Sequence, residues 1–181
     1  AVEKQNKNGR LKLKQDLAKG SFETLYILYG EEAYLREYYL RQLRKKVVDE
    51  TFADFNLIEL DGKTLTLESL TEAVDSYPAM SERKLVIVTD FNIYAPPASF
   101  GDQLIDLLSD LPDYVCLVFY FDILEAKPDK RTKMYKLLEK KACTAEFARL
   151  EEKELIVRLD RRARELHWII SDEGAAYMLC L

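Results

Sequence analysis

The stretch Leu25-Tyr26-Ile27-Leu28-Tyr29-Gly30-Glu31-Glu32-Ala33-Tyr34-Leu35 decides the fold. Its first five residues are apolar and predict a buried strand, and the glycine that follows delivers the chain to a helix. A phosphate-binding loop at this place requires Gly-x-x-x-x-Gly-Lys-Ser/Thr, because backbone amides, a lysine and a hydroxyl must hold phosphates and magnesium. Two acids, Glu31 and Glu32, stand there instead. The sequence therefore predicts a nucleotide-binding architecture without nucleotide chemistry, which favours a binding or mechanical role.

Apolar runs alternate with helical patterns along the rest of the chain. Strands are predicted at Leu25 to Tyr29, Asn56 to Leu60, Leu85 to Val88, Val115 to Phe121 and Thr144 to Phe147. Helices are predicted at about Glu32 to Val48, Leu67 to Ser76, Phe100 to Leu108 and Asp129 to Lys141. The continuous apolar runs at Leu85 and Val115 are typical of central strands that are buried on both faces. This alternation predicts an α/β fold with a mostly parallel five-stranded sheet flanked by helices.

The pattern changes at both ends of the chain. Residues 1–20 predict a tag remnant followed by an amphipathic helix, and residues 21–150 form the α/β domain. An acidic stretch, Glu151-Glu152-Lys153-Glu154, marks the start of a small helical second domain over residues 151–181. Because the chain stops inside a predicted helix at Leu181, we expect this second domain to be truncated.

Composition excludes several classes of protein. With 181 residues, 48% of them hydrophobic, the chain can bury a real core. Neither a long apolar run nor a signal peptide is present, which predicts no membrane insertion and no secretion. A net charge of -5 argues against a dedicated duplex-DNA binder. The cysteines Cys116, Cys143 and Cys180 are odd in number and far apart, which fits a reduced, cytoplasmic setting, and Cys116 is expected to be a small core residue.

Several motifs together carry a family resemblance. They are Leu28-Tyr29-Gly30-Glu31-Glu32-x-Tyr34-Leu35, Asn56 to Asp61-Gly62, Ser81-Glu82-Arg83-Lys84-Leu85-Val86-Ile87-Val88 and Asp129 to Leu138. In this order and spacing they resemble the delta subunits of the bacterial DNA polymerase III clamp loader, from roughly residue 11 to the end. The resemblance implies an AAA+-like (P-loop-type) fold without ATPase activity or Walker motifs. It also implies a part in DNA replication, in which the subunit binds the sliding clamp (beta subunit) and favours its open form.

The resemblance also implies a clamp-binding segment and a set of partners. Carried over onto this chain, the clamp contact falls on Tyr77, Pro78, Ala79 and Met80, just ahead of Ser81-Glu82-Arg83. Relatives commonly place a bulky residue where Ala79 stands, so Tyr77 or Met80 could carry the anchoring. The bland alternative is that Tyr77 and Met80 pack onto the core beneath the loop. The other loader subunits are expected partners of the full-length protein, and contact with DNA inside the complex stays open.

Two rival functions remain open from the residues. Asp61, Asp90 and Asp122 fall at strand ends, where an α/β sheet builds its sites, and could together bind magnesium in a degenerate nucleotide hydrolase. The basic segment from Lys127 to Lys141 could bind nucleic acid, although a solvated helix face explains it too, and Arg158 to Arg164 form a similar basic group. His167 is the only histidine, which excludes a histidine-based metal cluster. The sequence therefore predicts no catalytic residue, no cofactor and no metal site.

Overall fold

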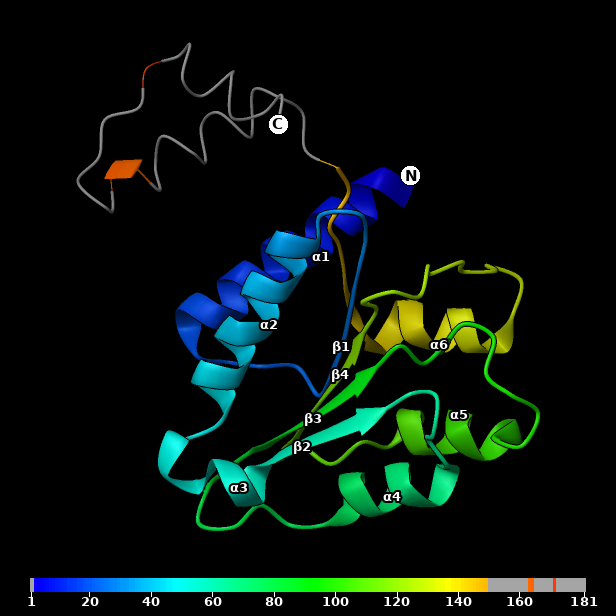
Figure 1. Ribbon diagram of the computed structural model, residues 1–181. Coiled ribbons are helices and arrows are strands. Elements are labelled where there is room, and N and C mark those ends of the chain that lie inside the picture. The colour runs from blue at the N-terminus through cyan, green and yellow to red at the C-terminus, as the bar shows by residue number, and fades with distance from the viewer. Residues whose placement is uncertain (1, 150–162, 165–170, 172–181) are drawn as a thin grey trace. The chain divides into compact units, whose positions relative to one another are not determined.

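Five strands form a single sheet in the computed structural model, which describes residues 2–149, 163, 164 and 171 (Figure 1). The strands are β1 (Leu25–Tyr29), β2 (Leu57–Asp61), β3 (Lys84–Thr89), β4 (Val115–Tyr120) and β5 (Cys143–Glu146). They lie in the order β2-β3-β4-β1-β5, and every neighbouring pair is parallel. The predicted α/β class with a five-stranded sheet is confirmed.

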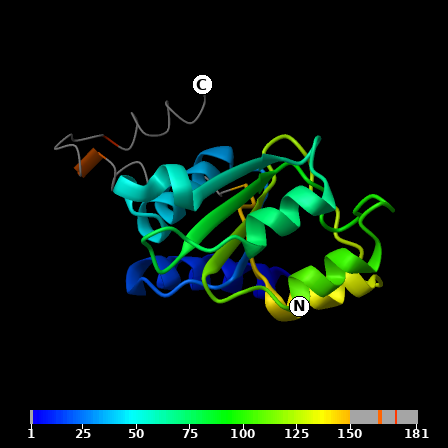
Figure 2. The same cartoon turned by 90° about the horizontal axis from the view of Figure 1, so that it is seen from below.

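Helices cover both faces of this sheet (Figures 1 and 2). They are α1 (Val2–Lys19), α2 (Ala33–Val47), the short α3 (Ala53–Asn56), α4 (Leu67–Asp75), α5 (Gly101–Ser109) and α6 (Lys133–Lys141), with a 3-10 turn at Glu50–Phe52. Leu70 of α4, Leu104 of α5 and Leu138 of α6 share one core with alternate residues of the strands. The opposite face of the sheet is covered by α1 and α2.

The two central strands explain why the sequence shows continuous apolar runs. Leu85, Val86, Ile87 and Val88 of β3 are all fully buried, as are the facing residues of β4. Successive side chains of a strand point to opposite faces, so a strand with helices on both sides needs apolar residues at every position. The placement of both runs at the centre of the sheet is confirmed.

Several predicted boundaries need correction. The last strand, for example, is Cys143–Glu146 rather than Thr144 to Phe147. The helix predicted from Asp129 begins only at Lys133, because Thr132 is the N-cap and its hydroxyl accepts the amide of Tyr135 at 3.1 Å. Asp129 instead turns back on its own chain, where its carboxylate accepts the amide of Arg131 at 3.0 Å. The strand predicted from Asn56 begins one residue later, since Asn56 ends α3.

The N-terminal segment, for which a tag remnant and an amphipathic helix were expected, is helical from Val2 to Lys19. Leu13 of α1 is fully buried, and a β-carbon on Gly9 would lie 1.8 Å from the carbonyl oxygen of Thr144 in β5. The helix therefore packs closely on the edge strand. No helix in the described part of the chain has the length and apolar character to span a bilayer.

The chain divides into two units, one up to Phe147 and one from Ala148. The predicted helical domain falls in the second unit, and the acidic stretch at its start lies outside the described residues. The same is true of His167, of Cys180 and of most of the basic group from Arg158 to Arg164. The domain limits at residues 20 and 150 stay predictions.

Candidate functional site

The parallel sheet presents two edges of different character. Gly30 and Asp90 follow directly on β1 and β3, and Asp122 comes two residues after the end of β4. All three therefore lie at the carboxyl edge, where ligand sites of α/β proteins are usually built. The segment Tyr77 to Met80, hereafter the 77–80 segment, lies between the end of α4 and the start of β3, at the opposite, amino edge. The two candidate regions are thus separated by the length of the strands.

At the carboxyl edge, the turn after β1 is occupied by the protein's own groups. The amide of Glu32 donates to the carbonyl oxygen of Phe147 at 2.9 Å, and a β-carbon on Gly30 would lie 2.4 Å from that same oxygen. The buried guanidinium of Arg36 donates to the Gly30 carbonyl. A phosphate bound at a glycine turn needs free backbone amides, but here the Glu32 amide already donates to the carbonyl of Phe147, directly after the neighbouring strand β5.

The three aspartates at this edge serve separate structural roles. Asp90 has a left-handed backbone (φ 57°), and its carboxylate accepts the amides of Asp122 and Leu124 at 2.8 and 3.0 Å. Asp122 accepts the Arg36 guanidinium at 3.3 Å, and Asp61 accepts the amide of Lys63 at 2.9 Å in a tight turn. Within the described residues, no group of three histidine, cysteine or acidic side chains is placed to share a metal ion. The structure does not assemble the triad that the hydrolase alternative requires.

At the amino edge, the 77–80 segment exposes its two large apolar side chains. Tyr77 is 83% exposed and Met80 is 85% exposed, while Pro78 and Ala79 are partly buried. The alternative in which Tyr77 and Met80 pack onto the core is therefore wrong for this structure. The segment lies beyond the last turn of α4, which ends at Asp75, rather than on the helix itself.

A buried asparagine holds the backbone of this segment. The side chain of Asn56, which is fully buried, accepts the amide of Ala79 at 2.8 Å and donates to the carbonyl of Ala79 at 2.9 Å. The next residue, Met80, has a left-handed backbone with φ of 51°. Asn56 was named from the sequence only as the start of a strand and of a motif, because a contact across 23 positions leaves no local pattern that predicts its role.

A buried lysine and a tyrosine support the other end of the segment. The ammonium of Lys84 donates to the carbonyl of Ser76, the C-cap of α4, and at 2.9 Å to its hydroxyl. The same ammonium lies 5.5 Å from the ring centroid of Tyr114. Burial lowers the pKa of Lys84 to about 8. The Tyr114 ring also packs against Tyr77 with centroids 5.0 Å apart, and its hydroxyl donates to the Asp75 carbonyl at 3.0 Å. Tyr77 therefore projects from a rigid base.

The basic segment is split between a loop and a helix. Lys127 and Arg131 pair with the nearby acids Glu125 and Asp129 in the loop before α6. The exposed lysines of α6 itself are Lys133, Lys136, Lys140 and Lys141. Met134 and Leu138 lie on its buried face, as expected for a solvated amphipathic helix. The nucleic-acid alternative stays a prediction.

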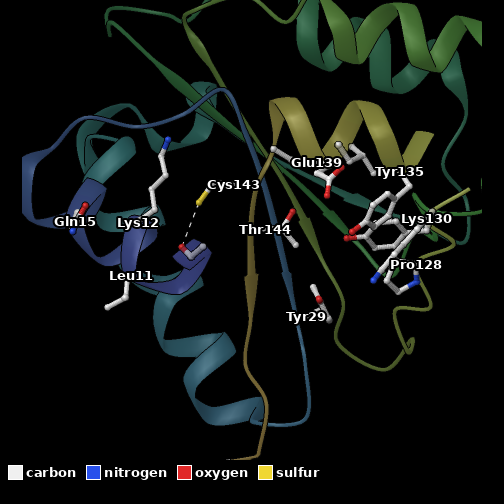
Figure 3. Close-up of a pocket in the computed structure, with 14 residues that line it drawn as sticks. Leu11, Lys12, Gln15, Tyr29, Pro128, Lys130, Tyr135, Glu139, Cys143 and Thr144 are labelled. Atoms are coloured by element: carbon white, nitrogen blue, oxygen red, sulfur yellow. Dashed lines mark hydrogen bonds between the residues drawn. The ribbon is translucent and has the colours of Figure 1, made fainter. Parts of the chain in front are cut away.

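A cavity of about 350 Å³ lies against β5 (Figure 3). Figure 3 shows Lys12 of α1, Thr144 of β5 and Tyr135 and Glu139 of α6 among its lining, and none of the 77–80 residues takes part. The thiol of Cys143, which faces the Gly9 carbonyl at 3.5 Å, has its pKa raised to about 12 by burial. Cys116 in β4 is likewise fully buried with a pKa raised to about 12, and its predicted role as a small core residue is confirmed.

Comparison with known proteins gives consistent matches. The family model for "DNA polymerase III, delta subunit" matches residues 26–148. DNA polymerase III subunit delta of Bacillus subtilis is 29% identical over 172 residues, which are 92% of this chain and 49% of that protein. The solved structure of the Bacillus subtilis DNA clamp loader delta protein superimposes with a TM-score of 0.74 at 27% identity, covering 93% of this chain and 51% of that one. The chain thus spans about half the length of these relatives.

Proposed function

Since this chain belongs to the DNA polymerase III delta subunit family, we propose that it binds the sliding clamp, the beta subunit, through the 77–80 segment. The observation that carries the proposal is the exposure of Tyr77 and Met80 on a loop whose backbone is fixed by Asn56. Large apolar side chains on a pre-ordered loop contribute most to binding, because little conformational entropy is lost when they enter a pocket. Because Tyr77 already packs on the Tyr114 ring, Met80 is the proposed main anchor.

The proposed consequence of binding is mechanical. A ligand shifts an equilibrium only by its difference in affinity for the two states, so the subunit favours an open clamp by binding that form more tightly. Each tenfold difference in affinity corresponds to about 1.4 kcal/mol of opening free energy. The subunit takes no part in ATP hydrolysis, because its Gly30 turn is closed by Phe147 and Arg36. Sister loader subunits supply that chemistry in the cytoplasmic complex.

The experiment is a measurement of affinity for the cognate clamp. The Tyr77→Ala, Met80→Ala double variant is compared with a Tyr34→Ala, Ile123→Ala control, which removes two exposed apolar side chains elsewhere on the chain. Complete burial of each anchor contributes about 1.5–3 kcal/mol, so the double variant is expected to raise Kd at least about 100-fold. Both variants should keep the wild-type Tm, because the replaced side chains are exposed in the free chain.

The outcomes separate the claims. Equal binding by the double variant and the wild type would place the clamp contact elsewhere. Failure of the wild-type chain to bind the clamp would overturn the proposed clamp binding itself. A rise in Tm on addition of magnesium and ATP would contradict the closed Gly30 turn and revive the nucleotide alternative, since any ligand of the native state raises stability by mass action.

A further inference from the structure

A third large apolar side chain is exposed at the amino edge. Phe55, in the short helix α3, is 69% exposed. It directly precedes Asn56, whose side chain is bonded to both the amide and the carbonyl of Ala79. Figure 1 shows α3 beside the loop that joins α4 to β3, and Figure 2 agrees from below. Phe55 thus belongs to a segment that is tied to the backbone between Tyr77 and Met80.

The tie makes the two segments one unit. Asn56 uses its amide oxygen and its amide nitrogen on the same residue, and because it is fully buried these bonds do not compete with water. The positions of α3 and the 77–80 segment are therefore fixed relative to each other before any partner arrives. A partner that covers both Met80 and Phe55 therefore pays no cost for ordering the two backbone segments relative to each other.

The charges around these residues indicate what kind of partner surface fits. Each apolar side chain of this region has an exposed carboxylate within two residues in the sequence. The four carboxylates are Asp54 beside Phe55, Asp75 near Tyr77, Glu82 near Met80 and Asp113 beside Tyr114. The neighbouring cations are turned to backbone carbonyls, Lys84 to Ser76 and Arg83 to Phe22 at 2.8 Å. The proposed surface, made of Phe55, Tyr77 and Met80, thus has an apolar centre and an acidic rim. Its electrostatic complement is an apolar pocket with lysine or arginine side chains at its margin.

We propose that Phe55 is a second anchor of the clamp-binding surface, and that the surface docks into an apolar pocket of the clamp with a basic rim. This inference rests on the proposed function. Phe55 sits outside the segment to which the family resemblance assigns the contact. It extends the binding surface from one loop to two chain segments that Asn56 holds together.

The test measures clamp binding by the 181-residue chain carrying Phe55→Ala, with Tyr34→Ala as the matched control. Tyr34 is an aromatic residue of similar exposure, 63%, at the start of α2. Phe55→Ala is expected to raise Kd about 10-fold, mainly through faster dissociation, while Tyr34→Ala leaves Kd unchanged. Both should keep the wild-type Tm. Suppose that the wild-type chain binds the clamp and that Met80→Ala weakens binding while Phe55→Ala does not. The second anchor is then excluded and the proposed function stands. If the wild-type chain does not bind the clamp, both the second anchor and the proposed function are refuted.

The rim is tested by the salt dependence of binding. The pair Asp54→Asn, Glu82→Gln should make affinity fall less steeply with rising salt. The control pair Asp102→Asn, Asp106→Asn, on α5 and outside the proposed surface, should leave the slope at its wild-type value. An unchanged slope in the first pair would overturn the basic-rim assignment. So would tighter binding by that pair at low salt, which would indicate an acidic margin on the partner.

Discussion

Replacement of Gly30 by alanine tests whether this glycine serves the packing of the chain. Gly20 offers a matched control, because both residues have a positive φ, 127° at Gly30 and 70° at Gly20. A β-carbon at Gly20 would meet nothing within 4 Å, whereas at Gly30 it would lie 2.4 Å from the carbonyl oxygen and 2.5 Å from the carbonyl carbon of Phe147. Gly20 lies in the left-handed region that alanine can adopt at a cost, whereas the φ of Gly30 is open almost only to glycine, so Gly30→Ala carries at least the strain of Gly20→Ala and the clash in addition.

The expected magnitudes differ several-fold. A non-glycine residue in such a backbone conformation costs about 1–2 kcal/mol, which is the whole effect expected for Gly20→Ala. At Gly30 the strand end must also move, which weakens the 2.9 Å hydrogen bond from Glu32 to Phe147 and the packing of the last residue of β1. Adding about 1 kcal/mol for that bond and 1–2 kcal/mol for displaced backbone gives a total of about 3–5 kcal/mol.

The assay is urea unfolding followed by circular dichroism, with Tm as a second measure. At about 2–4 °C per kcal/mol for a chain of this size, Gly30→Ala should lower Tm by about 6–20 °C and Gly20→Ala by about 2–8 °C. Equal losses in the two variants would refute the reasoning, because the contact with Phe147 would then contribute nothing. A Gly30→Ala variant that keeps the wild-type free energy of unfolding but binds the clamp more weakly would refute the reasoning as well.

Two further predictions concern the residues that shape the amino edge and the helix leading to it. Burial lowers the folded-state pKa of Lys84 from 10.5 to about 8, so between these pH values the unfolded chain holds a proton that the folded chain has lost. The free energy of unfolding should therefore rise with pH over this range, relative to a Lys84→Met variant. Parallel pH profiles of the two proteins would contradict this. Thr66→Ala removes the hydroxyl that accepts a hydrogen bond from the Ser69 amide at 3.1 Å at the start of α4, and should lower the free energy of unfolding in urea by about 1 kcal/mol. The control Thr64→Ala, at an exposed position two residues earlier, should change it by less than about 0.5 kcal/mol. Equal effects would show that the cap does not contribute.

Sequence reasoning was most successful where the signal is local. The strands at Leu85 and Val115 were predicted within one residue at each end, since an unbroken apolar run has few alternatives to a doubly covered strand. It failed by four residues at the start of α6, where Asp129 and Thr132 are both acceptable caps by type. The choice between them depends on where the Asp129 carboxylate turns, and it turns to Arg131.

The candidate site shows the same division. The exposed residues Tyr77 and Met80 were named from the sequence through the family resemblance, yet their apolar character alone could not say whether they face water or the core. No site role was predicted for the residues that settle the shape of the site, Asn56, Lys84 and Tyr114, although the first two stand in motifs of the family resemblance. Asn56 is 23 residues from its partner Ala79, and Tyr114 is 39 residues from the Asp75 carbonyl that it meets.

By itself the sequence determined the class of fold, the order of strands and helices along the chain, and the loss of phosphate-binding chemistry after β1. These features depend on periodicity and residue type within a few positions. Only the tertiary structure decided which aspartates stand apart and which loop is held rigid. It also decided that Asn56 bonds to Ala79 and so ties the segment carrying Phe55 to the 77–80 segment. Such facts depend on contacts between residues far apart in the chain, which exist only once the parallel sheet has brought its strand ends together.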